Sequence, residues 1–154
     1  KTITHRIALP VGGQALRVSP DGARLYVGDF HRPLLHVIDC ATAELVDTVP
    51  LTGVPGWPFN SLDGEIVIVT TYDEPADRGY VELLDTADLR NRRVIDLPAE
   101  PFHALPLRDG QHALVALANG DIAKIDLNNA ALVDGGFSAG GTMPETLLYL
   151  APPA

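Results

Sequence analysis

The sequence predicts an all-β fold of the β-propeller type, made of four-stranded antiparallel blades, and three observations support this prediction. An Asp-Gly turn recurs at Asp21, Asp63 and Asp109, at spacings of 42 and 46 residues. Repeats of about 40–45 residues with four strands each are typical of propeller blades. Short strand-like apolar runs separate these turns. The 14 glycines and 13 prolines are spread along the chain and interrupt most stretches in which a helical period could develop.

Three full blades and two partial ones are expected within one domain that covers residues 1–154. The full blades are predicted at about residues 10–51, 53–98 and 99–140. An outer strand at residues 2–9 and an inner strand at residues 144–150 would belong to incomplete blades. Because propellers usually close with about four to eight blades, we expect either a fragment of a longer propeller or one copy of a ring completed by an oligomer.

The strands follow one another in the order of a blade. In the first unit they are predicted at Ala15–Val18, Arg24–Gly28, Leu34–Asp39 and Glu44–Val49. The Asp-Gly pair between the first two favours a hairpin turn. In the second unit, Glu65–Thr71 is a run of β-branched and apolar residues, which suits a strand buried on both faces. The one short helical candidate, Thr86–Arg93, lies where the turn between the third and fourth strands belongs.

Two runs of the first unit carry a family resemblance. Ser19–Val27 followed by His36–Thr42 resembles the YVTN family of β-propeller repeats, whose pattern is SPDGxxLYV, a loop, and VxVIDxAT. The later units resemble it more loosely, and the apolar-Asp pair of the pattern recurs at Asp85 and Asp126. The resemblance implies a propeller like those of surface-layer and periplasmic proteins, related in scaffold to the haem d1 and quinoprotein amine dehydrogenase propellers.

The resemblance implies a scaffold rather than a chemistry, because one fold hosts many functions. It favours an extracytoplasmic location, although the sequence shows no signal peptide, and it leaves any cofactor open. No apolar run reaches the ~18 residues that span a bilayer, so no membrane span is expected.

The net charge is −9 and the isoelectric point is near 4.8. An acidic surface repels phosphate backbones, so nucleic acid is not expected as a partner. The basic run of Arg90, Arg92 and Arg93 is expected to be a solvated turn, with a phosphate- or acid-binding patch as the alternative. The single cysteine, Cys40, excludes an intramolecular disulfide and is expected to be a small buried hydrophobe at a strand end.

Two kinds of loop are expected to share one face around the mouth of the channel: those between blades, and those between the second and third strands. Loops on a rigid scaffold are where binding residues most often lie. The candidate ligand-binding residues are Gln14, His31, Arg32, Trp57, Tyr72 and Arg78. Trp57, the only tryptophan, could stack on a ring-shaped ligand or act as a plug packed between adjacent blades.

His103 and Glu145 are the candidate catalytic residues. His103 falls where the third unit enters the channel, and histidine can ligate a metal or act as an acid or base near neutral pH. Glu145 follows at the start of the next unit and could pair with it. The alternatives are a histidine bonded to a neighbouring blade and a solvated carboxylate. The remaining histidines, His5, His36 and His112, have no partner at ligand spacing.

Two further segments have competing explanations. The acids of the long loop Tyr72–Tyr80 could hold Ca²⁺, which takes oxygen ligands, but their spacing is not that of an EF-hand and a solvated loop is expected. Residues Gly136–Gly140 spell G-x-S-x-G, whereas a nucleophile elbow needs a strand before it and a helix after it. A glycine-rich loop between blades is expected there, and no metal site is predicted.

The sequence therefore favours a binding or scaffold module that presents its loop face to a protein or a small ligand. The alternative is a propeller enzyme, a lyase or hydrolase assisted by a metal or by acid and base groups, with its site at the channel mouth around His103 and Glu145. Assembly through the blade edges into a homo-oligomer is a third arrangement, because open apolar edges need to be covered.

Overall fold

The computed structural model describes residues 2–3, 5–10, 12–141 and 147. This part of the chain contains twelve β-strands and no helix. The strands are β1 (Gly13–Val18), β2 (Arg24–Asp29), β3 (Leu34–Asp39), β4 (Glu44–Pro50), β5 (Val54–Asn60), β6 (Ile66–Asp73), β7 (Arg78–Asp85), β8 (Arg92–Leu97), β9 (Pro101–Pro106), β10 (His112–Leu117), β11 (Asp121–Asp126) and β12 (Ala131–Ser138). None of the described residues belongs to a helix that could cross a membrane.

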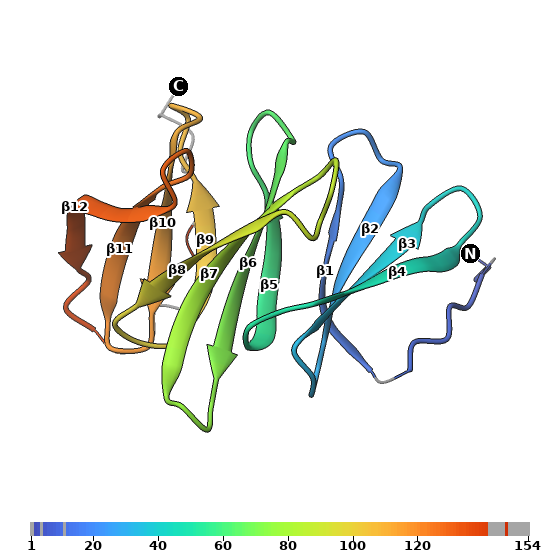
Figure 1. Ribbon diagram of the computed structural model, residues 1–154, viewed down its shortest axis with the longest axis horizontal. Coiled ribbons are helices and arrows are strands. Elements are labelled where there is room, and N and C mark those ends of the chain that lie inside the picture. The colour runs from blue at the N-terminus through green and yellow to red at the C-terminus, as the bar shows by residue number, and fades with distance from the viewer. Residues whose placement is uncertain (1, 4, 11, 142–146, 148–154) are drawn as a thin grey trace.

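The strands form three antiparallel sheets, each made of four strands that are consecutive in the chain (Figure 1). We call them blade 1 (β1–β4), blade 2 (β5–β8) and blade 3 (β9–β12). The blades lie side by side without closing into a ring, and β5 contacts both β1 and β9 (Figure 1). This arrangement confirms the predicted all-β, blade-built fold.

An aspartate holds the turn between the first two strands of every blade. Its Oδ1 accepts a hydrogen bond from the backbone N–H two residues later, at 3.0 Å for Asp21, 3.0 Å for Asp63 and 2.9 Å for Asp109. The glycine that follows each aspartate has a positive φ, of 74°, 79° and 71° in chain order. Residues with a Cβ rarely adopt that conformation, so the backbone of the turn requires the recurring Asp-Gly pair.

A second aspartate ends the third strand of every blade. The Oδ1 atoms of Asp39, Asp85 and Asp126 accept the backbone N–H two residues later, at 2.9, 2.8 and 2.8 Å. Such side-chain bonds stabilise a chain reversal, here toward the fourth strand. Cys40 lies in this turn, one residue beyond β3, and is therefore exposed rather than buried as expected. Both repeated motifs thus form turns at one end of the blades. The connections at the opposite end contain neither motif.

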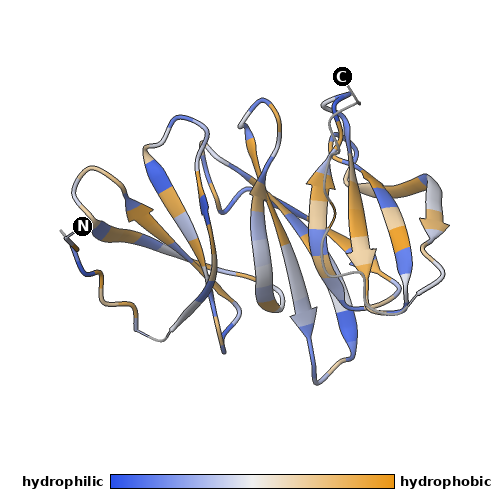
Figure 2. Ribbon diagram, turned by 180° about the vertical axis from the view of Figure 1, so that it is seen from behind, coloured by the Kyte–Doolittle hydropathy of each residue, from blue (hydrophilic) through white to orange (hydrophobic). Residues whose placement is uncertain are grey.

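Apolar side chains fill the two interfaces between neighbouring blades. Val67 and Val69 of β6 belong to the same buried cluster as Val37 of blade 1, and Ile68 belongs to the same buried cluster as Val115 of blade 3. Strand β6 is therefore buried on both faces, as predicted. Each fully buried side chain of this size stabilises the fold by roughly 1.5–3 kcal/mol. Hydrophobic residues occur along the strands of all three blades (Figure 2).

The basic run between Arg90 and Arg93 joins the blades. Arg90 donates two hydrogen bonds to the Asp47 carboxylate of blade 1, at 2.7 and 2.8 Å. Arg92 donates to the carbonyl oxygen at the end of β4, and Arg93 donates to the carbonyl oxygen of Asn128 in blade 3 at 2.5 Å. The expectation of a merely solvated turn is thus corrected, because these guanidinium groups bind protein atoms of both neighbouring blades.

The chain on either side of the three blades differs from the sequence-based expectation or is not described. The described residues of segment 2–9 form no strand, and a strand needs a hydrogen-bonded neighbour. The inner strand expected at residues 144–150 falls outside the described residues apart from Leu147. The three sheets themselves span residues 13–50, 54–97 and 101–138.

Candidate functional site

A cleft of about 610 Å³ opens at the end of the blades where the inner strands begin. We call it the mouth cleft. Strand β1 contributes Gln14 to its lining, β5 contributes Trp57 and β9 contributes Phe102. All three blades therefore take part, and the cleft lies at the end away from the Asp-Gly turns.

Connections between strands supply the walls of the mouth cleft. Phe30 and His31 come from the β2–β3 connection, Tyr72 from the end of β6 and Glu74 from the β6–β7 connection. Glu100 comes from the segment that leads from blade 2 into β9. The two kinds of loop that the sequence placed on one face thus contribute to one cleft.

Four of the six candidate ligand-binding residues line the mouth cleft. These four are Gln14, His31, Trp57 and Tyr72. Arg32 is not among the lining residues, because its guanidinium binds the Asp29 carboxylate. Arg78 is also not among them and lies exposed at the start of β7, paired in register with Asp73.

Trp57 presents its indole to the cleft while its backbone is held in place. The residue is 49% exposed, so the ring is not enclosed as a plug between blades. Its backbone N–H donates to Thr70 Oγ1 at 3.2 Å, and that hydroxyl donates to the carbonyl oxygen of Phe102 at 3.4 Å. A Cβ added to Gly56 would lie 2.8 Å from the same hydroxyl. The glycine therefore permits the close approach that anchors Trp57.

Carboxyl groups dominate the charge of the mouth cleft. Glu74 and Glu100 line it, and Asp77 accepts a hydrogen bond from the Tyr72 hydroxyl at 2.7 Å. That bond is the main reason why the pKa of Tyr72 is raised to about 12. Burial, with a further contribution from the carboxylates of Glu74 and Asp77, raises the pKa of Glu100. The described residues that line the cleft include no lysine or arginine.

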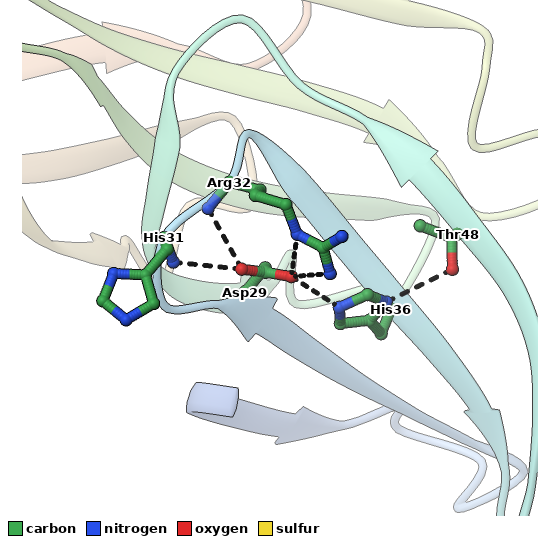
Figure 3. A network of polar contacts seen from close by, with 5 residues as sticks. All are labelled: Asp29, His31, Arg32, His36 and Thr48. Carbon is green, nitrogen blue, oxygen red and sulfur yellow. Dashed lines mark hydrogen bonds and ion pairs between the residues drawn. The ribbon is translucent and has the colours of Figure 1, made fainter. Parts of the chain in front are cut away.

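Arg32 belongs instead to a polar network on blade 1 (Figure 3). The enclosed Asp29 carboxylate accepts Arg32 Nε at 3.1 Å and Nη2 at 2.8 Å, and the backbone N–H groups of His31 and Arg32, each at 3.0 Å. Its Oδ2 lies 3.0 Å from Nε2 of His36, whose Nδ1 lies 3.2 Å from Thr48 Oγ1. Burial alone would raise the pKa of Asp29, but these hydrogen bonds outweigh it and hold that pKa well below its usual range.

A related cluster occupies the same place in blade 2. His36 and Glu82 each lie three residues before the aspartate that ends the third strand. Glu82 Oε1 accepts the Thr71 hydroxyl at 3.1 Å and the Thr52 N–H at 2.6 Å, and Oε2 lies 3.0 Å from Arg92 Nη1. Burial is the main reason why the pKa of Glu82 is raised. Blade 3 has an alanine at this place.

His36, for which the sequence shows no partner at ligand spacing, thus has two polar partners in the fold. The signal in the sequence is that a titratable residue stands at one strand position in two of the three units, flanked by apolar residues. Because His36 and Asp29 are both fully buried, the pair serves the fold of blade 1 rather than a ligand. Sequence reasoning also missed Phe30 and Glu100 as lining residues of the mouth cleft.

His103 lies away from the mouth cleft, on β9. Its ring centroid is 4.5 Å from that of Phe59 in an edge contact, and its Nδ1 accepts the N–H of Leu147 at 3.4 Å. Burial, and to a lesser extent the charge of Arg17, lower the pKa of His103. These residues line a second cleft of about 370 Å³. Glu145 lies outside the described residues, so its pairing with His103 stays a prediction.

The two segments with competing explanations consist mainly of strand. Strands β6 and β7 continue their pairing as far as Asp73 and Arg78, so little of the long 72–80 segment is loop. Nowhere in the described residues do three His, Cys, Asp or Glu side chains gather in a way that could hold a metal ion. Gly136 lies within β12, and the described residues after that strand form no helix, so the G-x-S-x-G run lacks the context of a nucleophile elbow.

No protein-family model matches the sequence. Among curated proteins, the chain is similar to protein NirF of Pseudomonas aeruginosa, with 28% identity over 130 residues. The match covers 75% of this chain and 32% of NirF, so the chain spans about a third of the length of that relative.

Solved structures share the fold at low sequence identity. Hydrazine synthase of Kuenenia stuttgartiensis superposes with a TM-score of 0.79 at 22% identity, over 86% of this chain and 39% of that one. The dihydro-heme d1 dehydrogenase NirN in complex with DHE gives a TM-score of 0.68 at 19% identity, over 87% of this chain and 29% of that one. These likenesses show the β-propeller fold, and the YVTN-type repeat is compatible with them.

Proposed function

We propose that this chain is a β-propeller binding module whose mouth cleft holds a ligand, either a small molecule or a side chain presented by a protein. The observation that carries the proposal is the half-exposed indole of Trp57, anchored through its backbone at a cleft that all three blades line. Exposed apolar surface at a hollowed site is typical of ligand-binding regions, and aromatic rings supply a large contact area there.

Phe30, which lies in the β2–β3 connection, supports the same role. It is 51% exposed, and its ring lies 4.6 Å from that of His31 at an interplanar angle of 89°. Side chains with only two rotatable bonds lose little conformational entropy when a ligand covers them. Two rigid aromatic side chains on different blades therefore offer a binding surface that is largely pre-formed.

The relatives support a binding role without defining the ligand. NirN is a dihydro-heme d1 dehydrogenase, and its structure is a complex with DHE. A haem-type compound is therefore a useful probe for this chain. Because the chain covers only 29% of NirN, the chemistry of that enzyme is not carried over to residues here.

Trp57 makes the proposal testable because it is the only tryptophan. We would record its fluorescence and the melting temperature of the chain with a panel of small molecules that includes haem. We expect at least one compound to change the emission of Trp57 and to raise the melting temperature. Phe30→Ala should abolish that rise, whereas Phe137→Ala, which removes a ring of similar exposure (54%) from β12, should retain it. A panel without any effect would contradict the proposal.

A propeller enzyme is the second candidate, and the lowered pKa of His103 beside the second cleft favours it. A neutral imidazole can accept a proton from a substrate. In that case His103→Ala would abolish turnover of a lyase or hydrolase substrate and leave the melting temperature close to that of the wild type. Unchanged turnover in the variant would remove His103 from the chemistry.

Assembly through the outer blades is a separate proposal. Large apolar side chains are exposed at both ends of the row of blades, namely Leu16 and Val46 of blade 1 and Leu132 and Phe137 of blade 3. Further blades, from a second copy or from a longer chain, would remove this surface from water. Light scattering after gel filtration tests whether a second copy covers this surface, because a discrete dimer is expected if the apolar side chains of two copies cover each other.

A further inference from the structure

The mouth cleft combines two kinds of group that together favour one class of ligand. Aromatic rings come from several loops and inner strands, including Trp57, Phe30, Tyr72 and Phe102. The electron-rich faces of such rings attract cations, most strongly in the case of tryptophan. The rings alone would also accept a neutral apolar ligand, so the charge of the cleft has to decide between the two.

The formal charge of the residues that line the mouth cleft is negative. Glu74 and Glu100 line the cleft, and no ion pair found among the described residues involves either of them. Asp77 adds a third carboxyl group close by, because it accepts a hydrogen bond from the hydroxyl of the lining residue Tyr72 at 2.7 Å. The arginine of the β2–β3 connection, Arg32, is already neutralised by Asp29.

From this combination we infer that the natural ligand of the mouth cleft is an organic cation, an ammonium group that contacts the aromatic rings and faces the carboxylates of Glu74 and Glu100. The inference rests on the proposed binding function and names the chemical class of its ligand. A cation that is only weakly hydrated, such as a quaternary ammonium, would lose little on leaving water and would gain both attractions.

The titration of Glu100 supports this assignment. Its pKa is raised mainly by burial and further by the neighbouring carboxylates of Glu74 and Asp77, so Glu100 lies close enough to both groups to be repelled by their negative charge. A bound cation would relieve that repulsion. An anionic ligand would add to it, so a compound that binds through carboxylate groups is disfavoured at this cleft.

Three probes of one shape separate charge from size. Choline carries the positive charge, 3,3-dimethylbutan-1-ol is its neutral isostere, and 3,3-dimethylbutanoate carries a negative charge. Each is titrated into the chain while the emission of Trp57 is followed. We expect choline to bind at least about tenfold more tightly than the alcohol, since cation–π and carboxylate contacts act together. We expect the carboxylate to bind more weakly than both, and added salt to weaken choline alone.

Variants assign the charge preference to named residues. The double variant Glu74→Gln with Glu100→Gln keeps the shape of both side chains and should reduce choline affinity to that of the alcohol. Glu44→Gln is the matched control, because Glu44 is an exposed acid of β4 that does not line the cleft. A trimethyl-lysine in a short capped peptide, titrated in parallel, distinguishes a protein side chain from a free small cation as the source of the ammonium group.

The outcomes separate this inference from the proposed function. If the alcohol or the carboxylate binds as tightly as choline, the cleft is a binding site but the cationic ligand class is wrong. The ligand class is equally wrong if the double variant keeps the preference for choline. The proposed binding function itself is wrong if Trp57 emission does not change with any compound. This covers the three probes, the trimethyl-lysine peptide and the compounds of the earlier panel.

Discussion

The Oδ2 atom of Asp29 lies 3.0 Å from the Nε2 atom of His36, and both side chains are completely enclosed in blade 1. The contact joins the end of β2 to the middle of β3, and Arg32 closes the solvent side of the carboxylate. A buried carboxylate needs such partners because removing it from water is costly. The stability of blade 1 should therefore depend on this one charged group.

Asp29→Asn should destabilise the chain by about 2–4 kcal/mol, because the change removes the carboxylate that pairs with Arg32 and is hydrogen-bonded to His36 inside the fold. Urea unfolding measures the loss. Asp96→Asn is the matched control, since Asp96 is exposed on β8 and should change the free energy of unfolding by less than about 0.5 kcal/mol. Equal losses in the two variants would show that the network contributes nothing.

Acid should weaken the wild-type chain through the same carboxylate. The pKa of Asp29 is lower in the folded chain than its ordinary value, so the unfolded state binds more protons in acid. The stability that Asp29 contributes is present above about pH 4 and is lost as the pH falls below that value. The free energy of unfolding of Asp29→Asn should thus vary less steeply with pH below about pH 4 than that of the wild type, whereas Asp96→Asn should follow the wild type.

Glu82 should produce the opposite pH dependence. Its pKa is raised in the folded chain, mainly by burial, so the folded state binds more protons than the unfolded state above about pH 4. The contribution of Glu82 to stability falls as the pH rises through its folded pKa. We expect Glu82→Gln to gain stability relative to the wild type between about pH 4 and neutrality. A difference between the two chains that does not change with pH would refute this assignment.

Gly79→Ala should destabilise the chain by about 1–3 kcal/mol through a backbone clash. A Cβ at this place on β7 would overlap the carbonyl oxygen of Ala99 and would lie 2.7 Å from a ring carbon of Pro101. Gly12→Ala is the control, because a Cβ at Gly12 meets nothing within 4 Å. Thermal unfolding of both variants tests the prediction, and an unshifted melting temperature for Gly79→Ala would contradict it.

The fold was predictable because its repeated features are local. The Asp-Gly turn and the aspartate that ends the third strand each depend on bonds between residues two apart, so the same short patterns mark every blade. The bounds of β3 follow directly, from Leu34 to Asp39. The segment 2–9 resembles a strand just as locally, but it forms none among its described residues, since pairing depends on a neighbour that the pattern does not contain.

The mouth cleft was predictable in part. The topology of a blade places Gln14 and Trp57 at one end of their strands, and the structure brings both to one cleft. The sequence does not show that Asp29 neutralises Arg32, because that depends on the enclosure of the carboxylate by β3. It likewise does not show Glu100 at the cleft, since the approach of the blade 2–blade 3 connection depends on packing at Gly79.

The uneven distribution of buried charge gives the row of blades a direction of unfolding. The aspartates of the surface turns occur in all three blades, whereas the enclosed Asp29 network belongs to blade 1 alone and blade 3 has an alanine at the corresponding place. Stacked repeats can open one unit at a time, because each contacts only its neighbours. During acidification, the backbone amides of β2 and β3 should therefore be the first to lose protection against hydrogen exchange, and those of β10 and β11 the last. Unfolding would then proceed along the chain from blade 1 to blade 3.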